Sequence, residues 1–118
     1  MEKTFDPTQL SQFTGSESFY RHALNPNIVF TDGAAYVAES AGAYWLLDEI
    51  VIAQHKPQVR REEFQVWKLE VKGGVGALSC EDGNGTLVFY KVIKYTDFPA
   101  PEIVLWFENG TIFLPSER

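Results

Sequence analysis

Asp48 is the residue whose setting most suggests chemistry. It lies within the apolar run Ala43 to Gln54, four positions after Tyr44, so a helix there carries Tyr44 and Asp48 on one face. A buried carboxylate needs a partner or a proton, and both conditions recur at active sites. The alternative is that Asp48 and Glu49 simply form the solvated stripe of that helix.

Three further polar residues could join Asp48 in chemistry. His22 could be a general base, although the sequence positions no orienting partner beside it. Asp32 and Asp97 each follow a threonine at the end of an apolar run, and each could present a carboxylate at a sheet edge. Helix capping at Asp32 and an Asx-type turn at Asp97 are the simpler explanations. If a pocket forms between helix and sheet, we expect His22, Asp32, Tyr44 and Asp48 to line it.

The other chemistry-bearing residues form no familiar motif. Cys80 is the one cysteine, and the two acids that follow it disfavour a thiolate, which predicts a buried structural cysteine without an intrachain disulfide. His22 and His55 are too far apart for metal-ligand spacing. The glycine-rich segment 73–76 joins two predicted strands and opens no helix, so it predicts a hairpin loop rather than a phosphate loop. We therefore expect no catalytic set, no cofactor and no metal.

Aromatic side chains offer contacts rather than reactions. Trp67, Trp106 and Phe98 are candidates for an exposed aromatic surface, because large aromatic residues are frequent interface anchors. Both tryptophans lie on predicted strands and could equally belong to the core. Phe98 stands in a loop between Asp97 and Pro99, and we include Asp97 and Phe98 among the candidate contact residues.

The charge is acidic and unevenly distributed. The 118 residues carry a formal net charge of −6, and residues 1–55 hold seven acids against two bases. Nucleic acids and anionic membranes attract concentrated Lys and Arg, so we expect neither as a partner. No stretch approaches the ~20 apolar residues that span a bilayer, and the start lacks the apolar run of a secretory signal. Together with the single cysteine, these features predict a cytoplasmic protein.

The first half of the sequence predicts mostly helices. Asp6 and Pro7 are typical of a helix start, and Gly15 ends that short helix. Ser18 to Leu24 favours a short strand. Thr31 or Asp32 caps a helix over residues 34–39, and a stronger helix follows from Ala43 to about Gln54. This second helix is apolar on most sides, which predicts a covered position in the core or in a core plus a subunit interface.

Beyond Pro57 the period of the apolar pattern changes to two, which is typical of strands. Asn109-Gly110 predicts a hairpin with a type I′ turn, and segment 82–85 (Asp-Gly-Asn-Gly) predicts another in which both central residues have positive φ. Residues 86–95 are apolar on both faces, so we expect a central strand there. Five strands are predicted, over residues 64–71, 77–80, 86–95, 103–107 and 111–114.

These elements predict a single α+β domain over residues 1–118. Its N-terminal helices, within a helical region of about 6–55, pack on a mostly antiparallel meander sheet of about five strands within about 62–115. A chain of this length is typical of one domain.

Three segments together resemble a known family. They are Tyr20-Arg21-His22, then Thr31-Asp32-Gly33 leading into Ala43-Tyr44-Trp45-Leu46-Leu47-Asp48, and finally Tyr95-Thr96-Asp97-Phe98-Pro99 with the terminal Leu114-Pro115-Ser116-Glu117. In this order they resemble a family of small bacterial domains of unknown function, often encoded on phage-like or plasmid-like elements. The resemblance implies a bacterial, intracellular accessory protein, and it implies no catalytic role for any residue.

Three hypotheses for function follow. The favoured one is a non-enzymatic binding or regulatory accessory protein, a homo-oligomer that acts through protein–protein contacts, because aromatics are abundant and no catalytic set converges. The second is a small-molecule-binding protein or small hydrolase with a pocket near Asp48. The third is an acidic decoy that binds a basic partner through the acids of residues 1–55.

Overall fold

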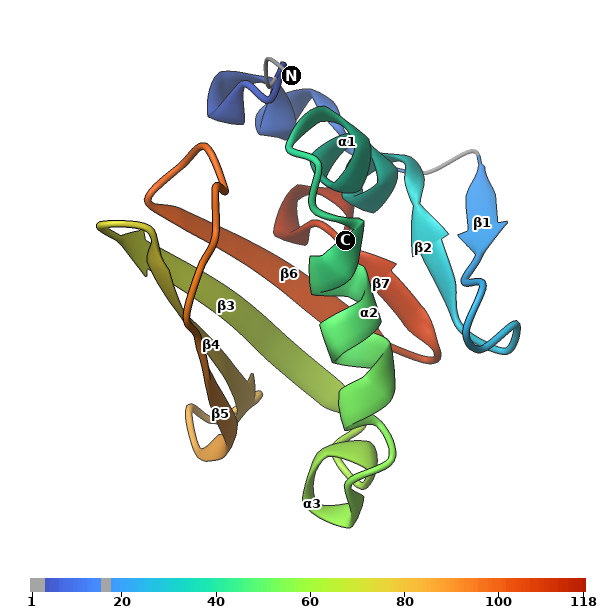
Figure 1. Cartoon of the computed structure of the whole chain (residues 1–118). Helices are drawn as coiled ribbons and strands as arrows, with labels where there is room; N and C mark the ends of the chain where they lie inside the picture. Colours follow the sequence, from blue (N-terminus) through green and yellow to red (C-terminus); the bar gives the residue numbers. More distant parts are fainter. Residues whose placement is uncertain (1–3, 16–17) are drawn as a thin grey trace.

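A seven-stranded mixed sheet forms the frame of the molecule, which we describe from a computed structural model over residues 4–15 and 18–118. The strand order is β1-β2-β7-β6-β3-β4-β5, and Figure 1 shows the sheet running from β1 on the right to β5 on the left. All neighbours are antiparallel except β2 and β7, which are parallel. The strands are β1 (Phe19–Arg21), β2 (Val29–Thr31), β3 (Phe64–Lys72), β4 (Val75–Asp82), β5 (Leu87–Ile93), β6 (Glu102–Glu108) and β7 (Thr111–Phe113).

Two α-helices cover one face of this sheet, with α2 lying across its middle (Figure 1). Helix α1 (Asp32–Ser40) begins where the Thr31 side chain accepts a hydrogen bond from the Ala34 amide. Gly42, at a φ of 62°, separates it from α2 (Tyr44–Ala53), because glycine enters the left-handed region without a Cβ clash. The short elements are η1 (Pro7–Gln12), α3 (Pro57–Arg60) and η2 (Pro115–Glu117).

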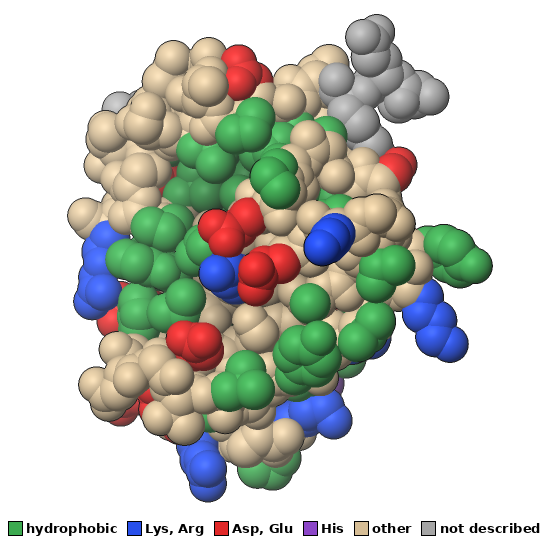
Figure 2. Space-filling model, turned by 90° about the vertical axis from the view of Figure 1, so that its left-hand side faces the viewer, with side chains coloured by type: hydrophobic (Ala, Val, Ile, Leu, Met, Phe, Trp, Pro, Cys, Tyr) green, Lys and Arg blue, Asp and Glu red, His purple; other side chains and the backbone are tan. Residues whose placement is uncertain are grey.

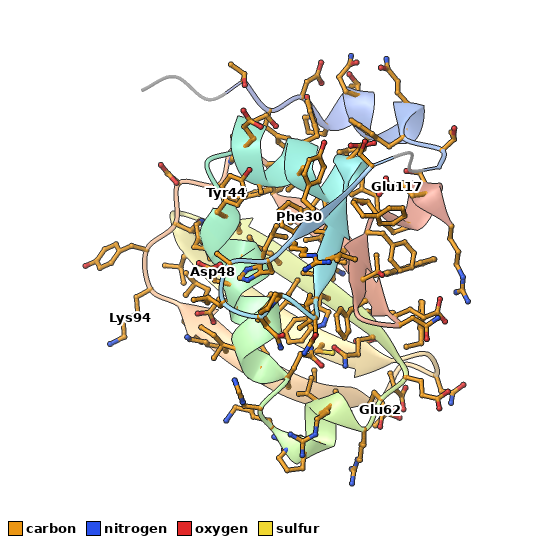
Figure 3. All side chains as sticks on the ribbon, turned by 90° about the vertical axis from the view of Figure 1, so that its right-hand side faces the viewer. Phe30, Tyr44, Asp48, Glu62, Lys94 and Glu117 are labelled. Carbon is orange, nitrogen blue, oxygen red and sulfur yellow. The ribbon has the colours of Figure 1, made fainter. Side chains whose placement is uncertain are left out.

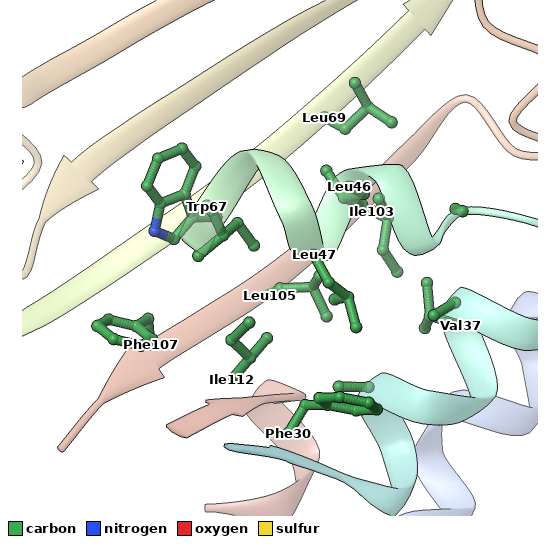
Figure 4. Close-up of a cluster of buried hydrophobic side chains, with 14 of the residues drawn as sticks. Phe30, Val37, Leu46, Leu47, Trp67, Leu69, Ile103, Leu105, Phe107 and Ile112 are labelled. Atoms are coloured by element: carbon green, nitrogen blue, oxygen red, sulfur yellow. The ribbon is translucent and has the colours of Figure 1, made fainter. Parts of the chain in front are cut away.

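The core lies between the helices and the sheet. On β3, Trp67 and Leu69 point to the helices while Lys68 between them is half-exposed, as the period of two requires. Figure 4 shows Trp67 and Leu69 on one side of α2 and Phe30 on the other, with Leu46 and Leu47 of α2 between them. Each such side chain contributes about 1.5–3 kcal/mol when it is fully buried, so this layer fixes how α2 sits on the sheet.

A buried glutamine pair joins the end of α2 to β3. Gln65 is completely buried, and its amide exchanges two hydrogen bonds with the amide of Gln54, at 2.8 and 2.9 Å. The Gln65 Oε1 also accepts from Trp67 Nε1 at 2.9 Å, and its Nε2 donates to the Val59 and Glu62 carbonyls. Every buried side-chain polar atom in the described residues has a partner, so this network stabilises the core without an unpaired group.

The C-terminal turn η2 holds the start of α1. The Glu117 carboxylate accepts from Thr31 Oγ1 at 2.7 Å, from the Gly33 amide at 3.1 Å and from the Leu114 amide at 2.8 Å. A Cβ on Gly33 would lie 2.5 Å from Glu117 Oε1 and 2.6 Å from Leu114 Cδ1. Glycine at position 33 therefore permits the close approach, and the negative charge is favourable at a helix N-terminus.

The predicted α+β class is confirmed, but the sheet differs from the predicted meander. It has seven strands rather than about five, because β1 and β2 from the predicted helical region join it beside β7. The chain also passes from β5 at one edge to β6, which pairs on the far side of β3. A purely local pattern does not contain such long-range pairing.

Two predictions about individual strand segments are wrong in detail. The strand expected to be central, residues 86–95, is β5 (Leu87–Ile93) at the edge of the sheet. None of its apolar residues is fully buried: Leu87, Tyr90 and Val92 are exposed, and the other apolar residues are half-buried. In the turn after β4 only Gly85 has positive φ, at 87°, whereas Asn109 and Gly110 adopt φ values of 53° and 70° as a type I′ turn requires. The first predicted helix is the 3-10 helix η1, capped by Asp6 as expected.

Candidate functional site

The outer stripe of α2 is the centre of the candidate site. Tyr44, Asp48 and Ile52 follow one another at intervals of four residues and therefore lie on one helix face. Tyr44 and Ile52 are exposed, at 48% and 53% of their full surface, and Asp48 is half-exposed, while Leu47 and Ile50 on the opposite face are buried. The predicted helix apolar on most sides is thus covered on its inner side and carries an amphipathic stripe on its outer side.

His22 and Asp48 form a buried-to-exposed pair beside this stripe. His22 Nε2 lies 2.8 Å from Asp48 Oδ1, with His22 at 5% exposure and the Asp48 side chain at 45%. His22 Nδ1 accepts a hydrogen bond from the Leu24 amide at 3.0 Å, so Nε2 carries the proton and donates it to Asp48. The pair ties the loop after β1 to the middle of α2.

Aromatic rings continue the surface from Asp48 to α1. The Phe30 ring contacts His22, Tyr20 and Tyr44, with centroid separations of 6.4, 5.6 and 6.4 Å. The Tyr20 hydroxyl donates to Asp32 Oδ1 at 3.0 Å, and this hydrogen bond to the Asp32 carboxylate raises the pKa of Tyr20. Figure 3 shows Tyr44 and Asp48 on the same side of the molecule, with Phe30 beside Tyr44.

The exposed members of this group are apolar or aromatic. Tyr20, Leu24, Tyr44 and Ile52 are all exposed, Leu24 at 61%. We call Tyr20, Leu24, Tyr44, Asp48 and Ile52 the α2 surface. Phe30 and His22 are buried beneath it, and the exposed rings of Tyr20 and Tyr44 pack against Phe30.

Several polar groups in and next to the α2 surface are paired within the chain. Both ring nitrogens of His22 have partners, so neither is available to take a proton from a substrate. Asp32 accepts from Tyr20, and its side chain lies at the start of α1. In the described residues no group of three His, Cys, Asp or Glu side chains is placed to hold a metal ion. The arrangement is suited to contact rather than to proton transfer.

The structure places four of the six candidate residues together. Tyr44 and Asp48 belong to the α2 surface, and His22 is buried beneath it. Asp32 lies next to the surface, where it accepts a hydrogen bond from Tyr20. They line a packed surface rather than a pocket between helix and sheet.

The other two candidates lie in the connection after β5. The expectation of an exposed Phe98 is wrong: the side chain is buried, at 5% exposure, and stacks on Phe5 at 5.5 Å between ring centroids. In this turn the Thr96 hydroxyl accepts a hydrogen bond from the Phe98 amide at 3.1 Å. Asp97 is exposed beside Trp45, Tyr95 and Thr96. Trp67 is also buried, whereas Trp106 is partly exposed on the sheet face away from the helices.

Sequence reasoning missed three residues of the surface and one that supports it. Tyr20 was quoted in the Tyr20-Arg21-His22 segment but was not identified as a contact residue. Ile52 appeared only as part of an apolar helix, although its spacing of four from Asp48 could have marked it. Leu24 lies in a loop and gives no periodic signal. Glu117 was quoted in a terminal motif, but its contact with Thr31, 86 residues away, has no local signature.

A family model described as a family of unknown function (DUF6876) matches residues 5–118. The chain belongs to this family. The expected resemblance to a family of unknown function is thereby confirmed. A crystal structure of a protein of unknown function from Enterococcus faecalis is similar in fold, with a TM-score of 0.50 and 16% identity over 100% of this chain and 98% of that one. At this identity the likeness shows the fold alone. No curated protein matches the chain.

None of the helices in the described residues is long and apolar enough to cross a membrane.

Proposed function

We propose that this chain is a non-enzymatic accessory protein that acts through protein–protein contacts, and that the α2 surface is its contact site. The observation that supports this is the contrast between paired polar groups and exposed apolar side chains within the site. The polar groups of His22 and Asp32 are already paired within the chain, whereas Tyr20, Leu24, Tyr44 and Ile52 are exposed. Rigid aromatic anchors surrounded by apolar contacts are typical of binding hot spots.

The same pairing weighs against the hydrolase alternative. A hydrolytic site needs a base with a free lone pair next to a nucleophile. In His22, Nδ1 accepts from the Leu24 amide and Nε2–H donates to Asp48, so the ring has no free lone pair. The acidic decoy hypothesis gains no particular support, because the α2 surface is dominated by aromatic and apolar side chains. Self-association, a cytoplasmic setting and an origin on bacterial mobile elements stay predictions.

Site-specific photo-crosslinking tests the proposal. A photoreactive phenylalanine is placed at Tyr44 or at Ile52, and at Gln12 as the control, which is exposed on η1 away from the α2 surface. After irradiation in the producing cells, adducts are analysed by mass. We expect one discrete adduct at Tyr44 and Ile52, either of a second copy or of another protein, and none at Gln12.

Equal labelling at all three positions, or no discrete adduct at Tyr44 and Ile52, would contradict a specific contact site. Light scattering on the purified chain then separates self-association from a different partner, because a second copy doubles the mass without any addition.

A further inference from the structure

We infer that the edge strand β5 and the groove between β5 and α2 bind an extended peptide of alternating apolar and acidic residues as an eighth strand of the sheet. This inference rests on the proposal that the chain binds proteins, and it adds the place, the conformation and the chemistry of one partner. It concerns the other flank of α2 from Tyr20 and Leu24, toward Glu49 and Lys91.

The two edges of the sheet are unequal. At one edge β1 has three residues, whereas β5 at the other has seven. Within the described residues no strand pairs with the outer side of β5, and none of its residues is buried. A long edge strand presents a row of backbone N–H and C=O groups that can pair with an added strand. Short edges such as β1 are one of the ways in which proteins avoid this pairing.

A groove runs beside this edge on the helix side. It has a volume of about 340 Å³ and is lined by Glu49, Ile52, Ala53, Lys56, Phe89, Tyr90 and Lys91. An edge strand next to a helix is the arrangement in which several peptide-binding domains accept an extended ligand, with backbone hydrogen bonds for affinity and side-chain pockets for specificity. The groove therefore has room for alternate side chains of an added strand.

The charge of the groove selects the ligand. Residues 85–96 contain two lysines, Lys91 and Lys94, and no acid, although the whole chain is acidic. The one acid in the lining, Glu49, is paired with Lys91 at 2.9 Å. Lys56, the N-cap residue of α3, adds a positive charge to the lining outside that pair. A second copy of β5 would bring lysines against lysines between two acidic chains, so the charges favour an acidic segment of another protein.

The two faces of β5 determine the alternation of acidic and apolar residues in the bound peptide. Lys91 points to the helix side, where it reaches Glu49, and Tyr90 and Val92 point to the opposite face, where they line a second groove of about 490 Å³. Figure 2 views the molecule from the β5 side of the sheet and shows hydrophobic side chains next to Lys, Arg, Asp and Glu side chains. An added strand places acids over Lys56 and beside the Lys91–Glu49 pair, and apolar residues beside Tyr90 and Val92.

Fluorescence anisotropy with labelled peptides tests this inference. The probe is a capped peptide as long as β5 that alternates valine and glutamate, and its matched control replaces every glutamate with lysine. We expect saturable binding of the acidic peptide to the full chain and affinity at least about tenfold lower for the lysine peptide. Equal affinity for the two peptides, or no binding of either, would overturn the inference.

Two further comparisons distinguish strand addition from simple charge attraction. N-methylation of alternate peptide residues in one phase removes the amides that face β5, and methylation in the other phase spares them. One phase should therefore lose about tenfold or more in affinity and the other should not. Lys91→Gln should weaken binding several-fold, whereas Arg21→Gln on β1, at the opposite edge, should leave it unchanged. If both methylated phases bind equally, or if both variants weaken binding equally, the added-strand arrangement is wrong.

The result is separable from that of the photo-crosslinking. An adduct at Tyr44 together with no peptide binding would reject the β5 groove and leave the proposed function standing. Ile52 borders both sites, because it also lines the groove, so Tyr44 is the position that separates them. Peptide binding without an adduct at Tyr44 would support the groove and reject the α2 surface. A concentration-dependent dimer that Lys91→Gln abolishes would identify a second copy as the occupant and overturn the acidic-peptide inference.

Discussion

Replacing Asp48 with alanine removes the acceptor for the buried His22 Nε2–H, which lies 2.8 Å from Asp48 Oδ1. A buried donor left without a partner costs about 1–3 kcal/mol of folding free energy. Because Asp48 is half-exposed, water can approach the vacated position, so we expect a loss near the lower half of that range, about 1–2 kcal/mol.

Asp48→Asn keeps a carbonyl oxygen that can accept the same hydrogen bond. A charge-assisted bond is about twice as strong as a neutral one, so asparagine should lose about half as much stability as alanine. Glu49→Ala is the matched control on the next residue of α2. It removes a surface ion pair with Lys91, which is typically worth about 0–1 kcal/mol.

Urea unfolding followed by tryptophan fluorescence measures these differences. With a slope of about 1–3 kcal/mol per molar urea for a small protein, Asp48→Ala should lower the midpoint by about 1 M without changing the slope. Amide exchange at Leu24, which donates to His22 Nδ1, should accelerate in the same variant. A midpoint equal to that of the parent chain, or equal losses for alanine and asparagine, would refute the structural role of the pair.

Three other substitutions or treatments have defined outcomes. Gly33→Ala should destabilise the chain by about 1–3 kcal/mol in urea unfolding. The cost should be smaller on a Glu117→Ala background, because the added Cβ collides with Glu117 and substitutions at contacting sites are not additive. Additive costs would contradict the clash. Gln65→Leu removes the acceptor of Trp67 Nε1–H and the donor to Gln54 Oε1. We therefore expect a loss of about 2–4 kcal/mol in the same assay, against about 0.5 kcal/mol or less for an exposed control such as Gln58→Leu. Burial raises the pKa of Cys80 to about 12, so a thiol reagent at pH 8 should label it only at the rate of global unfolding. Because the raised pKa keeps the Cys80 thiol protonated in the folded chain while the unfolded chain ionises, the contribution of Cys80 to stability is complete below the ordinary thiol pKa and declines as pH rises from there toward 12. The parent chain should therefore lose more stability between pH 8 and 10 than Cys80→Ala.

The parts of the fold that sequence predicted well are those with strong local signals. Helix α2 follows from a long apolar run that ends before Pro57, and the Asn109-Gly110 turn follows from two residues that tolerate positive φ. Thr31 caps α1 as one of two proposed alternatives.

The errors concern long-range pairing and burial. The apolar residues of β5 predicted a central strand, but an edge strand with exposed apolar residues has the same sequence pattern. The parallel pairing of β2 with β7 joins segments about 80 residues apart, and no periodicity encodes it. Phe98 was a candidate for an exposed contact residue because it stands in a loop between Asp97 and Pro99, yet its ring is buried and packs against Phe5.

The candidate site shows the same division. His22 and Asp48 were both identified by residue type and setting, but their contact spans 26 positions and depends on the loop after β1 reaching α2. Residue type indicated which side chains could do chemistry, whereas the geometry shows that His22 and Asp48 hydrogen-bond each other.

The affinity of the photo-crosslinked partner for the Tyr44→Ala variant tests the central claim most directly. The partner, whether a second copy or another protein, is titrated against the parent chain, Tyr44→Ala and the control Gln12→Ala. A contact anchored on Tyr44 predicts a loss of at least about tenfold for Tyr44→Ala and less than about twofold for Gln12→Ala, since a substitution outside the contact leaves binding nearly unchanged. Equal affinities for all three chains would show that the α2 surface is not the contact site.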